Sequence, residues 1–168
     1  MPDWNAIVGS EGPAVWRTIW RLVRNRADAD ECFQETFLSA LKLGQDHTVQ
    51  NWRALLTRIA TARAVDRLRQ RSRQSNREEP ADFESIEDRE IKPHDRAISR
   101  ELADRLRQAL ARIPPRQAEV FSLACIDQWS YEQIAGHLGI SVDSVGVLVH
   151  RARARLREML VSMNEVSR

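Results

Sequence analysis

Long apolar runs are missing from this sequence of 168 residues, and so is a secretion signal. No window approaches the roughly 18 consecutive apolar residues that a membrane-spanning helix needs. The first residues, MPDWNAIVGSEG, lack the basic start and the apolar stretch of a signal peptide. We therefore expect a cytoplasmic protein without membrane insertion.

Cysteine is scarce as well. Cys32 and Cys125 are far apart and show no CxxC spacing, so the sequence predicts neither a disulfide framework nor a thiolate metal site. Both thiols stand among apolar residues in helical patterns. We expect them to be buried and unbonded in a reducing compartment.

Motifs for catalysis are also missing. The four histidines are scattered, and none follows a glutamate at the ExxH spacing of carboxylate-bridged metal helices. The sequence contains no Gly-rich phosphate loop, no HExxH and no nucleophile elbow. We expect no catalytic residue, no metal and no cofactor, and we interpret His137 and His150 as polar surface positions.

Glycine and proline are few, with six of each. The residues that dominate instead are Ala, Leu, Arg, Glu and Gln, which are strong helix formers. This composition predicts an all-α fold.

Charge is nearly balanced, with a net charge of +2, but it is unevenly distributed. Residues 63–77 contain six arginines and one aspartate, whereas residues 78–90 contain seven acids and one arginine. A second basic run consists of Arg151, Arg153, Arg155 and Arg157. Such segregation is typical of proteins that bind a polyanion, although solvated helix faces would produce the same pattern.

Helical periodicity predicts three helices in the N-terminal part. The first covers residues 15–23 after Pro13, the second covers 27–43 and stops at Gly44, and the third begins near Val49. Their apolar faces would form a small bundle. We interpret Trp52 as a core residue, with stacking on an unpaired DNA base as the alternative.

A polar, acidic stretch separates this part from the rest of the chain. Helical periodicity resumes at Ile98, and Pro114-Pro115 closes one helix and opens the next. The sequence therefore predicts two small helical domains, residues 1–73 and 95–168, joined by a flexible acidic linker over residues 74–94.

Residues 131–149, YEQIAGHLGISVDSVGVLV, carry a helix-turn-helix pattern. Ser130 and Gln133 predict a capping box, and Gly139 predicts a left-handed helix end. Ser141 would cap the second helix.

Two further positions distinguish this pattern from an ordinary helical hairpin. Ala135 is small enough for two helices to cross closely, and Val145 would face back toward the first helix. We therefore predict that the second helix enters the major groove of DNA.

Three segments of the chain resemble regions of bacterial sigma factors. Residues 110–160 resemble their C-terminal promoter-binding domain, and residues 28–42 (DADECFQETFLSALK) resemble the segment that grips the polymerase clamp. Residues 51–73 (NWRALLTRIATARAVDRLRQRSR) resemble the helix that reads and melts the −10 element. Three motifs in this order, with an acidic linker, resemble the extracytoplasmic-function (ECF) group.

The resemblance implies a function, partners and site residues. The chain would bind core RNA polymerase and promoter DNA, direct DNA melting and transcription initiation, and be restrained by an anti-sigma factor. The implied contacts with core polymerase are Asp30, Gln34, Glu35 and Phe37. The implied −10 contacts are Asn51, Trp52, Arg63, Arg67, Arg69 and Arg71. The implied −35 contacts are Ser141, Asp143, Ser144, Val147, His150, Arg151 and Arg153.

The middle of the recognition helix departs from the family pattern. Gly146 and Leu148 stand where related factors often carry Lys and Arg, and Val147 between them is apolar. Either Asp143, Ser144 and the arginine run carry more of the readout, or recognition depends on DNA shape. Leu148 could equally be a core residue, and Gly146 could allow close approach of the backbone to DNA.

Two other functions are compatible with the helix-turn-helix. A free-standing regulator would bind operators without polymerase, but it would leave the N-terminal helices unexplained. A protein–protein adaptor would use the fold without DNA.

Overall fold

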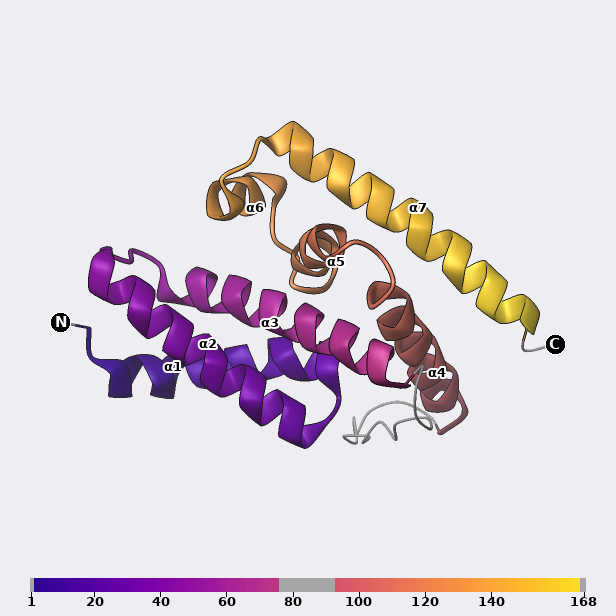
Figure 1. Cartoon of the computed structure of the whole chain (residues 1–168), viewed down its shortest axis with the longest axis horizontal. Helices are drawn as coiled ribbons and strands as arrows, with labels where there is room; N and C mark the ends of the chain where they lie inside the picture. Colours follow the sequence, from indigo (N-terminus) through magenta and orange to yellow (C-terminus); the bar gives the residue numbers. More distant parts are fainter. Residues whose placement is uncertain (1, 76–92, 167–168) are drawn as a thin grey trace.

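The first three helices lie side by side and form an N-terminal bundle. In the computed structural model, which describes residues 2–75 and 93–166, they are α1 (Trp4–Val23), α2 (Arg26–Asp46) and α3 (Trp52–Ser75). α3 packs against both of the others (Figure 1). Ile19 and Leu56 are fully buried between them, and burial of each such side chain contributes about 1.5–3 kcal/mol. The predicted three-helix bundle is confirmed.

α1 begins much earlier than the sequence pattern predicted. The Asp3 carboxylate accepts a hydrogen bond from the Ala6 N–H at 3.1 Å and caps the helix, and Pro13 lies inside the helix on its exposed side. A proline there removes one backbone hydrogen bond. The earlier turns are held because Trp4 packs edge-on against Trp52, with ring centroids 4.9 Å apart. The prediction that the helix begins after Pro13 is therefore wrong.

Gly44 lies inside α2 and does not end it, so the predicted stop is also wrong. A Cβ atom at Gly44 would lie 2.6 Å from a ring carbon of Trp52 and 3.5 Å from one of Trp4. Glycine is needed at this position because the Trp52 ring lies directly on the backbone of α2. Trp52 thus packs within the bundle, as the core interpretation predicted.

Residues 93–166, the described part of the C-terminal half, form four further α-helices and a π-helical turn. They are α4 (Pro93–Leu110), α5 (Pro115–Phe121) with its continuation Ser122–Ile126 (η1), α6 (Tyr131–Leu138) and α7 (Val142–Val166). Pro115 occupies the first turn of α5, as predicted. α7 packs over α4, α5 and α6 and forms one edge of the molecule (Figure 1).

Every regular element among the described residues is helical, which confirms the all-α prediction. None of the described helices combines the length and the apolar character needed to cross a membrane. The predicted acidic linker, residues 74–94, lies almost entirely outside the described residues.

One apolar cluster joins the two halves. It runs from the bundle into Leu110, the last residue of α4, and into Ile113 just beyond it. α3 contacts α4, α5 and α6 on the side away from α2. Asp127, with 9% of its side chain exposed, lies 3.7 Å from Arg21 and accepts a hydrogen bond from Thr18 at 3.4 Å. In this structure α3 is therefore covered on both sides.

Candidate nucleic-acid interface

Local hydrogen bonds set the helix-turn-helix formed by α6 and α7. The Ser130 hydroxyl accepts from the Gln133 N–H at 3.1 Å, and the Gln133 side chain accepts from the Ser130 N–H at 2.9 Å. Gly139 ends α6 with φ 64°. The Ser141 hydroxyl accepts from the Ser144 N–H at 3.1 Å and starts α7. The predicted capping box, left-handed glycine and second cap are all confirmed.

Packing within this unit fixes which side of α7 is exposed. Val145 and Val149 are buried against Ile134, and the small side chain of Ala135 is also buried. Positions three and four residues apart share a helix face. The exposed residues opposite the buried pair are Asp143, Ser144, Val147, His150 and Arg151. We call these five residues the α7 reading face.

Two residues predicted at the −35 interface have other contacts. Ser141 caps α7, and its hydroxyl also lies 2.8 Å from that of Ser144. Arg153 is exposed, but its guanidinium donates toward the Cys125 sulfur at 3.5 Å and so points along the flank of α7. Neither belongs to the reading face.

The unusual centre of the recognition helix has a structural explanation. Leu148 packs against the apolar cluster of the helix-turn-helix, which supports its interpretation as a core residue. Gly146 is partly buried against Tyr131, and an added Cβ would lie 3.7 Å from that ring, at ordinary contact distance. Gly146 therefore lies on the side of α7 that meets Tyr131, which favours a structural role for it over close approach of the backbone to DNA.

Three of the predicted −10 arginines point toward α2. Arg63, Arg67 and Arg71 are spaced by four residues and therefore share one face of α3. Their acidic partners on α2 are Asp28, Glu31 and Glu35.

The shortest of these ion pairs joins Arg67 to Glu31 at 2.6 Å, and Arg71 lies 3.1 Å from Asp28. Arg63 is the most exposed of the three arginines, with 43% of its side chain accessible, and its pair with Glu35 is 4.0 Å long. These arginines neutralise acids between helices and leave little free positive charge there.

The remaining −10 candidates also have partners within the protein. Arg69 lies on another face of α3 and donates to the carbonyl oxygens of Ala111 and Ile113, just beyond α4. The Asn51 side chain accepts from the Ala54 N–H at 3.0 Å at the start of α3, yet Asn51 remains exposed.

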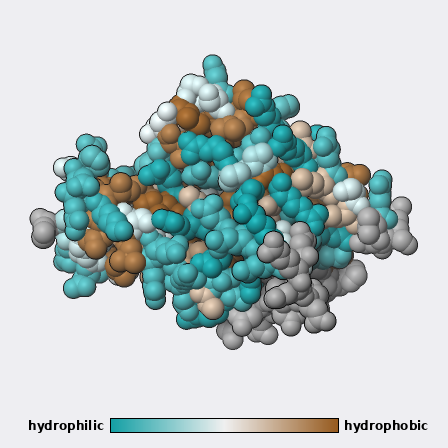
Figure 2. Space-filling model, viewed as in Figure 1, coloured by the Kyte–Doolittle hydropathy of each residue, from teal (hydrophilic) through white to brown (hydrophobic). Residues whose placement is uncertain are grey.

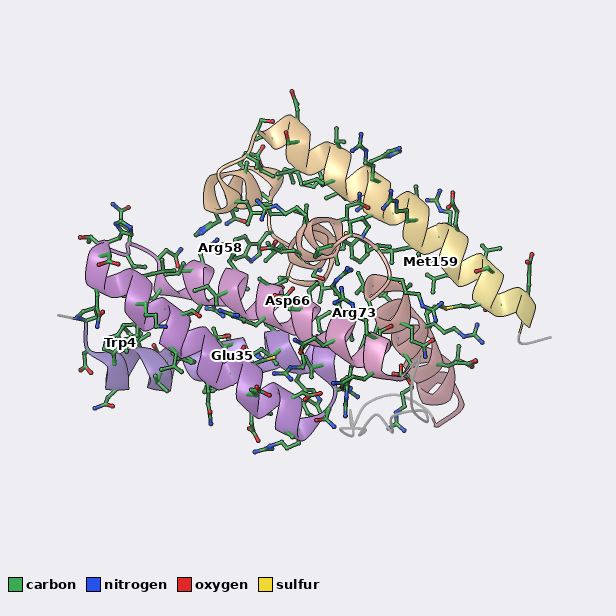
Figure 3. The ribbon with its side chains drawn as sticks, in the orientation of Figure 1. Trp4, Glu35, Arg58, Asp66, Arg73 and Met159 are labelled. Carbon is green, nitrogen blue, oxygen red and sulfur yellow. The ribbon has the colours of Figure 1, made fainter. Side chains whose placement is uncertain are left out.

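Other charged side chains of α3 lie toward the C-terminal half. Figure 3 shows Arg58 and Asp66 on the side of α3 that faces α5 and α6.

The predicted polymerase contacts on α2 lie partly on its outward side. Asp30 and Gln34 are exposed, whereas Glu35 is half-buried beside Arg63 (Figure 3). Phe37 is partly buried against Phe33, with ring centroids 4.9 Å apart. Sequence reasoning missed Leu38.

Leu38 is 58% exposed on this outward side of α2. It lies four residues after Gln34, and this apolar side chain in an otherwise polar stripe is the signal that could have identified it.

The two cysteines are free, as expected. Cys32 is buried, and its thiol lies 3.8 Å from the carbonyl oxygen of Arg63. Burial raises the pKa of this thiol to about 11, although the nearby Arg67 opposes the increase. Cys125 is only partly buried.

Comparisons with known proteins identify both halves. Residues 7–74 match the family profile of Sigma-70 region 2, and residues 103–156 match that of Sigma-70, region 4. A free-standing regulator or an adaptor built on a helix-turn-helix alone does not account for the first match, so these two alternatives are set aside.

Individual relatives agree with this result. The chain is 31% identical to RNA polymerase sigma factor CarQ of Myxococcus xanthus over 161 residues, which cover 93% of this chain and 88% of that protein. It is 30% identical over 160 residues to ECF RNA polymerase sigma factor SigE of Mycolicibacterium smegmatis. That alignment covers 95% of this chain but 62% of the relative.

A solved structure has the same fold. The sigma factor RpoE of Bartonella quintana, determined with the anti-sigma factor NepR, superposes with a TM-score of 0.58 at 24% identity. The match covers 95% of this chain and 98% of that one. With both region profiles in order and relatives aligned over nearly its full length, the chain belongs to the sigma-70 family of RNA polymerase sigma factors, in its extracytoplasmic-function group.

Proposed function

We propose that this sigma factor acts in the cytoplasm, binds core RNA polymerase and directs it to the promoters of a specific regulon. The observation that carries the proposal is the exposed α7 reading face within the region 4 match, together with the region 2 match over residues 7–74. In this proposal the polymerase performs the chemistry, and the sigma factor selects the start site.

The outward side of α2 is the proposed contact with core polymerase. Asp30 and Gln34 present a carboxylate and an amide there, and Leu38 adds an exposed aliphatic side chain. The carboxylate of Glu35 is partly exposed beside Arg63. An apolar centre surrounded by polar groups is typical of protein–protein interfaces. Phe37 is partly buried next to this surface and contacts Phe33.

The α7 reading face is the proposed −35 contact. Asp143 and Ser144 lie in the first turn of the helix, where recognition helices meet base edges. His150 and Arg151 lie about two turns further along, where phosphate contacts give affinity and salt dependence. Arg153, directed along the flank, adds positive charge near the same phosphates.

The start of α3 is the proposed −10 contact. Asn51 is exposed there, Trp52 is held next to it, and Arg63 keeps an exposed edge. Arg67 and Arg71 hold α2 against α3 through their ion pairs. Arg69 becomes available to the melted strand only when the C-terminal half moves away from α3, because the carbonyls beyond α4 now occupy its guanidinium.

An anti-sigma factor is a further proposed partner. The structure of RpoE contains one, and on α4 of this chain Ile98 and Leu102 are 55% and 57% exposed at positions one turn apart. Neighbouring exposed apolar side chains favour burial by a protein partner.

Reconstitution with core RNA polymerase tests the proposal. The purified factor should co-elute with core enzyme and produce discrete transcripts from a genomic library, and mapping their starts should reveal two upstream elements. Leu38→Asp should reduce co-elution, whereas Val161→Ala, an exposed change on α7, should not. Absence of core binding together with tight binding to a palindromic duplex would contradict the proposal.

A further inference from the structure

An apolar side chain stands at the centre of the α7 reading face. Val147 is 47% exposed, and Asp143 and Arg151 lie one turn before and one turn after it. The buried residues Val145 and Val149 lie on the opposite side of the helix. Figure 2 shows apolar surface in this region, over α6 and the first turns of α7.

Packing does not explain this valine. Leu148 belongs to the apolar cluster and Gly146 lies against Tyr131, but Val147 is absent from both clusters of buried residues and their partly buried neighbours. Intrinsic propensity does not explain it either, because valine is a poorer helix former than alanine, lysine or arginine. The position therefore carries an apolar group that faces outward without a partner in the described part of the protein.

The major groove offers one apolar feature to such a group. A recognition helix docks with the side opposite its core facing the base edges. Valine has no hydrogen-bonding atom in its side chain, so it cannot distinguish the donors and acceptors of the bases. The C5 methyl group of thymine is the apolar element that projects into the major groove.

We infer that Val147 is a specificity-determining residue that contacts a thymine methyl group in the upstream promoter element. The inference rests on the proposed function, since it takes α7 to dock in the major groove at that element. It assigns base discrimination to the centre of the α7 reading face, between the acidic first turn and the basic residues that follow.

Replacement of thymine by uracil provides the test, because it removes the methyl group and keeps every hydrogen-bonding group of the base. The upstream element is first selected from randomised DNA with the reconstituted holoenzyme, and each thymine is then replaced singly. Promoter binding should fall about fourfold at one position, the factor expected for burial of one methyl group. Elsewhere in the element the replacement should have little effect.

Val147→Ala supplies the matching protein change. The side chain is exposed and alanine favours helices, so this variant should fold. It should bind the thymine promoter more weakly than the wild type and should no longer respond to uracil at the sensitive position. Val161→Ala is the control: Val161 is 53% exposed on the same helix, about 21 Å further along at 1.5 Å per residue, and this variant should retain the uracil response.

The outcomes distinguish a failure of the Val147 methyl contact from a failure of the proposed function. If holoenzyme selects an element but no uracil replacement weakens binding, or if Val147→Ala responds to uracil as the wild type does, the methyl contact is overturned and the proposed function stands. If no element is selected and no promoter-dependent transcript forms, the proposed function fails, and the inference fails with it.

Discussion

α3 and α7 carry similar arginine-rich sequences, but their arginines are used in different ways. On α3, Arg67 and Arg71 face the acids of α2 and form ion pairs. On α7, Arg151 and Arg155 are exposed, and neither forms an ion pair with another described residue. The difference arises because α2, which carries those acids, packs against α3. α7 packs against α4, α5 and α6, and in the described part of the chain no carboxylate of these helices pairs with Arg151 or Arg155. An arginine run therefore indicates a DNA-binding surface only when the neighbouring helix leaves it uncovered.

Charge-reversal mutations should show the largest difference in stability effect between α3 and α7. Arg67→Glu would place a fourth acid among Asp28, Glu31 and Glu35, so it should lower the free energy of unfolding by about 2–4 kcal/mol. Arg151→Glu, on the exposed face of α7, should change it by less than about 0.5 kcal/mol. Urea denaturation followed by circular dichroism measures both values, and equal losses would contradict the comparison.

Removal of the Arg151 side chain should affect DNA binding in preference to stability. Arg151→Ala should weaken binding of holoenzyme to a promoter by about tenfold and reduce the slope of log K against log salt by about 1. Arg153→Ala should have a smaller effect, because Arg153 points toward Cys125. Titrations at several salt concentrations provide the measurement. A larger effect at Arg153 would show that the flank of α7, and not its reading face, lies on the phosphates.

Gly146→Ala tests whether Gly146 only packs against Tyr131 or also lies close to DNA. Alanine should raise the free energy of unfolding by about 1 kcal/mol, because it is a better helix former than glycine. The new Cβ fits without a clash, since it meets Tyr131 at 3.7 Å. Transcription from a mapped promoter should remain unchanged. A stabilised protein with impaired transcription would mean that Gly146 approaches DNA after all.

Replacement of Asp127 tests the contact between the N-terminal bundle and the C-terminal half. Burial raises the pKa of this carboxyl, although Arg21 and the hydroxyls of Thr18 and Thr61 oppose the increase. An acid whose pKa is raised on folding favours the folded state at low pH, and that contribution is lost as the pH rises through the folded pKa. Asp127→Asn should therefore be slightly more stable than the wild type at pH 7, and the difference should shrink as the pH approaches 4. Unfolding midpoints at a series of pH values provide the measurement, and a destabilised variant at pH 7 would show that the Arg21 ion pair outweighs burial.

Features set by hydrogen bonds between near neighbours could be predicted from the sequence. The caps at Ser130 and Ser141 and the turn at Gly139 depend on residues within three or four positions, so their residue types identify them. Features set by contact between helices were predicted less well. Pro13 and Gly44 lie inside helices because Trp4 and Trp52 pack together across the bundle.

The same limit applies to the candidate site. The reading face of α7 follows from helical spacing around two buried valines, and the predicted −35 contacts Asp143, Val147 and Arg151 share this exposed side. Arg67 and Arg71 required knowledge of the helix beside them. The four-residue spacing of these arginines and of the α2 acids Glu31 and Glu35 was visible in the sequence, and it indicates a pair of complementary faces.

The burial of Cys32 gives the α2–α3 contact a chemical reporter. Thiol reagents attack the thiolate, and with a pKa of about 11 only about one Cys32 in ten thousand is ionised at pH 7. The side chain is also 1% exposed, so alkylation must await separation of the two helices. The rate at which Cys32 is labelled therefore measures how often α2 opens from α3, and Cys125, which is partly exposed, serves as the fast internal reference.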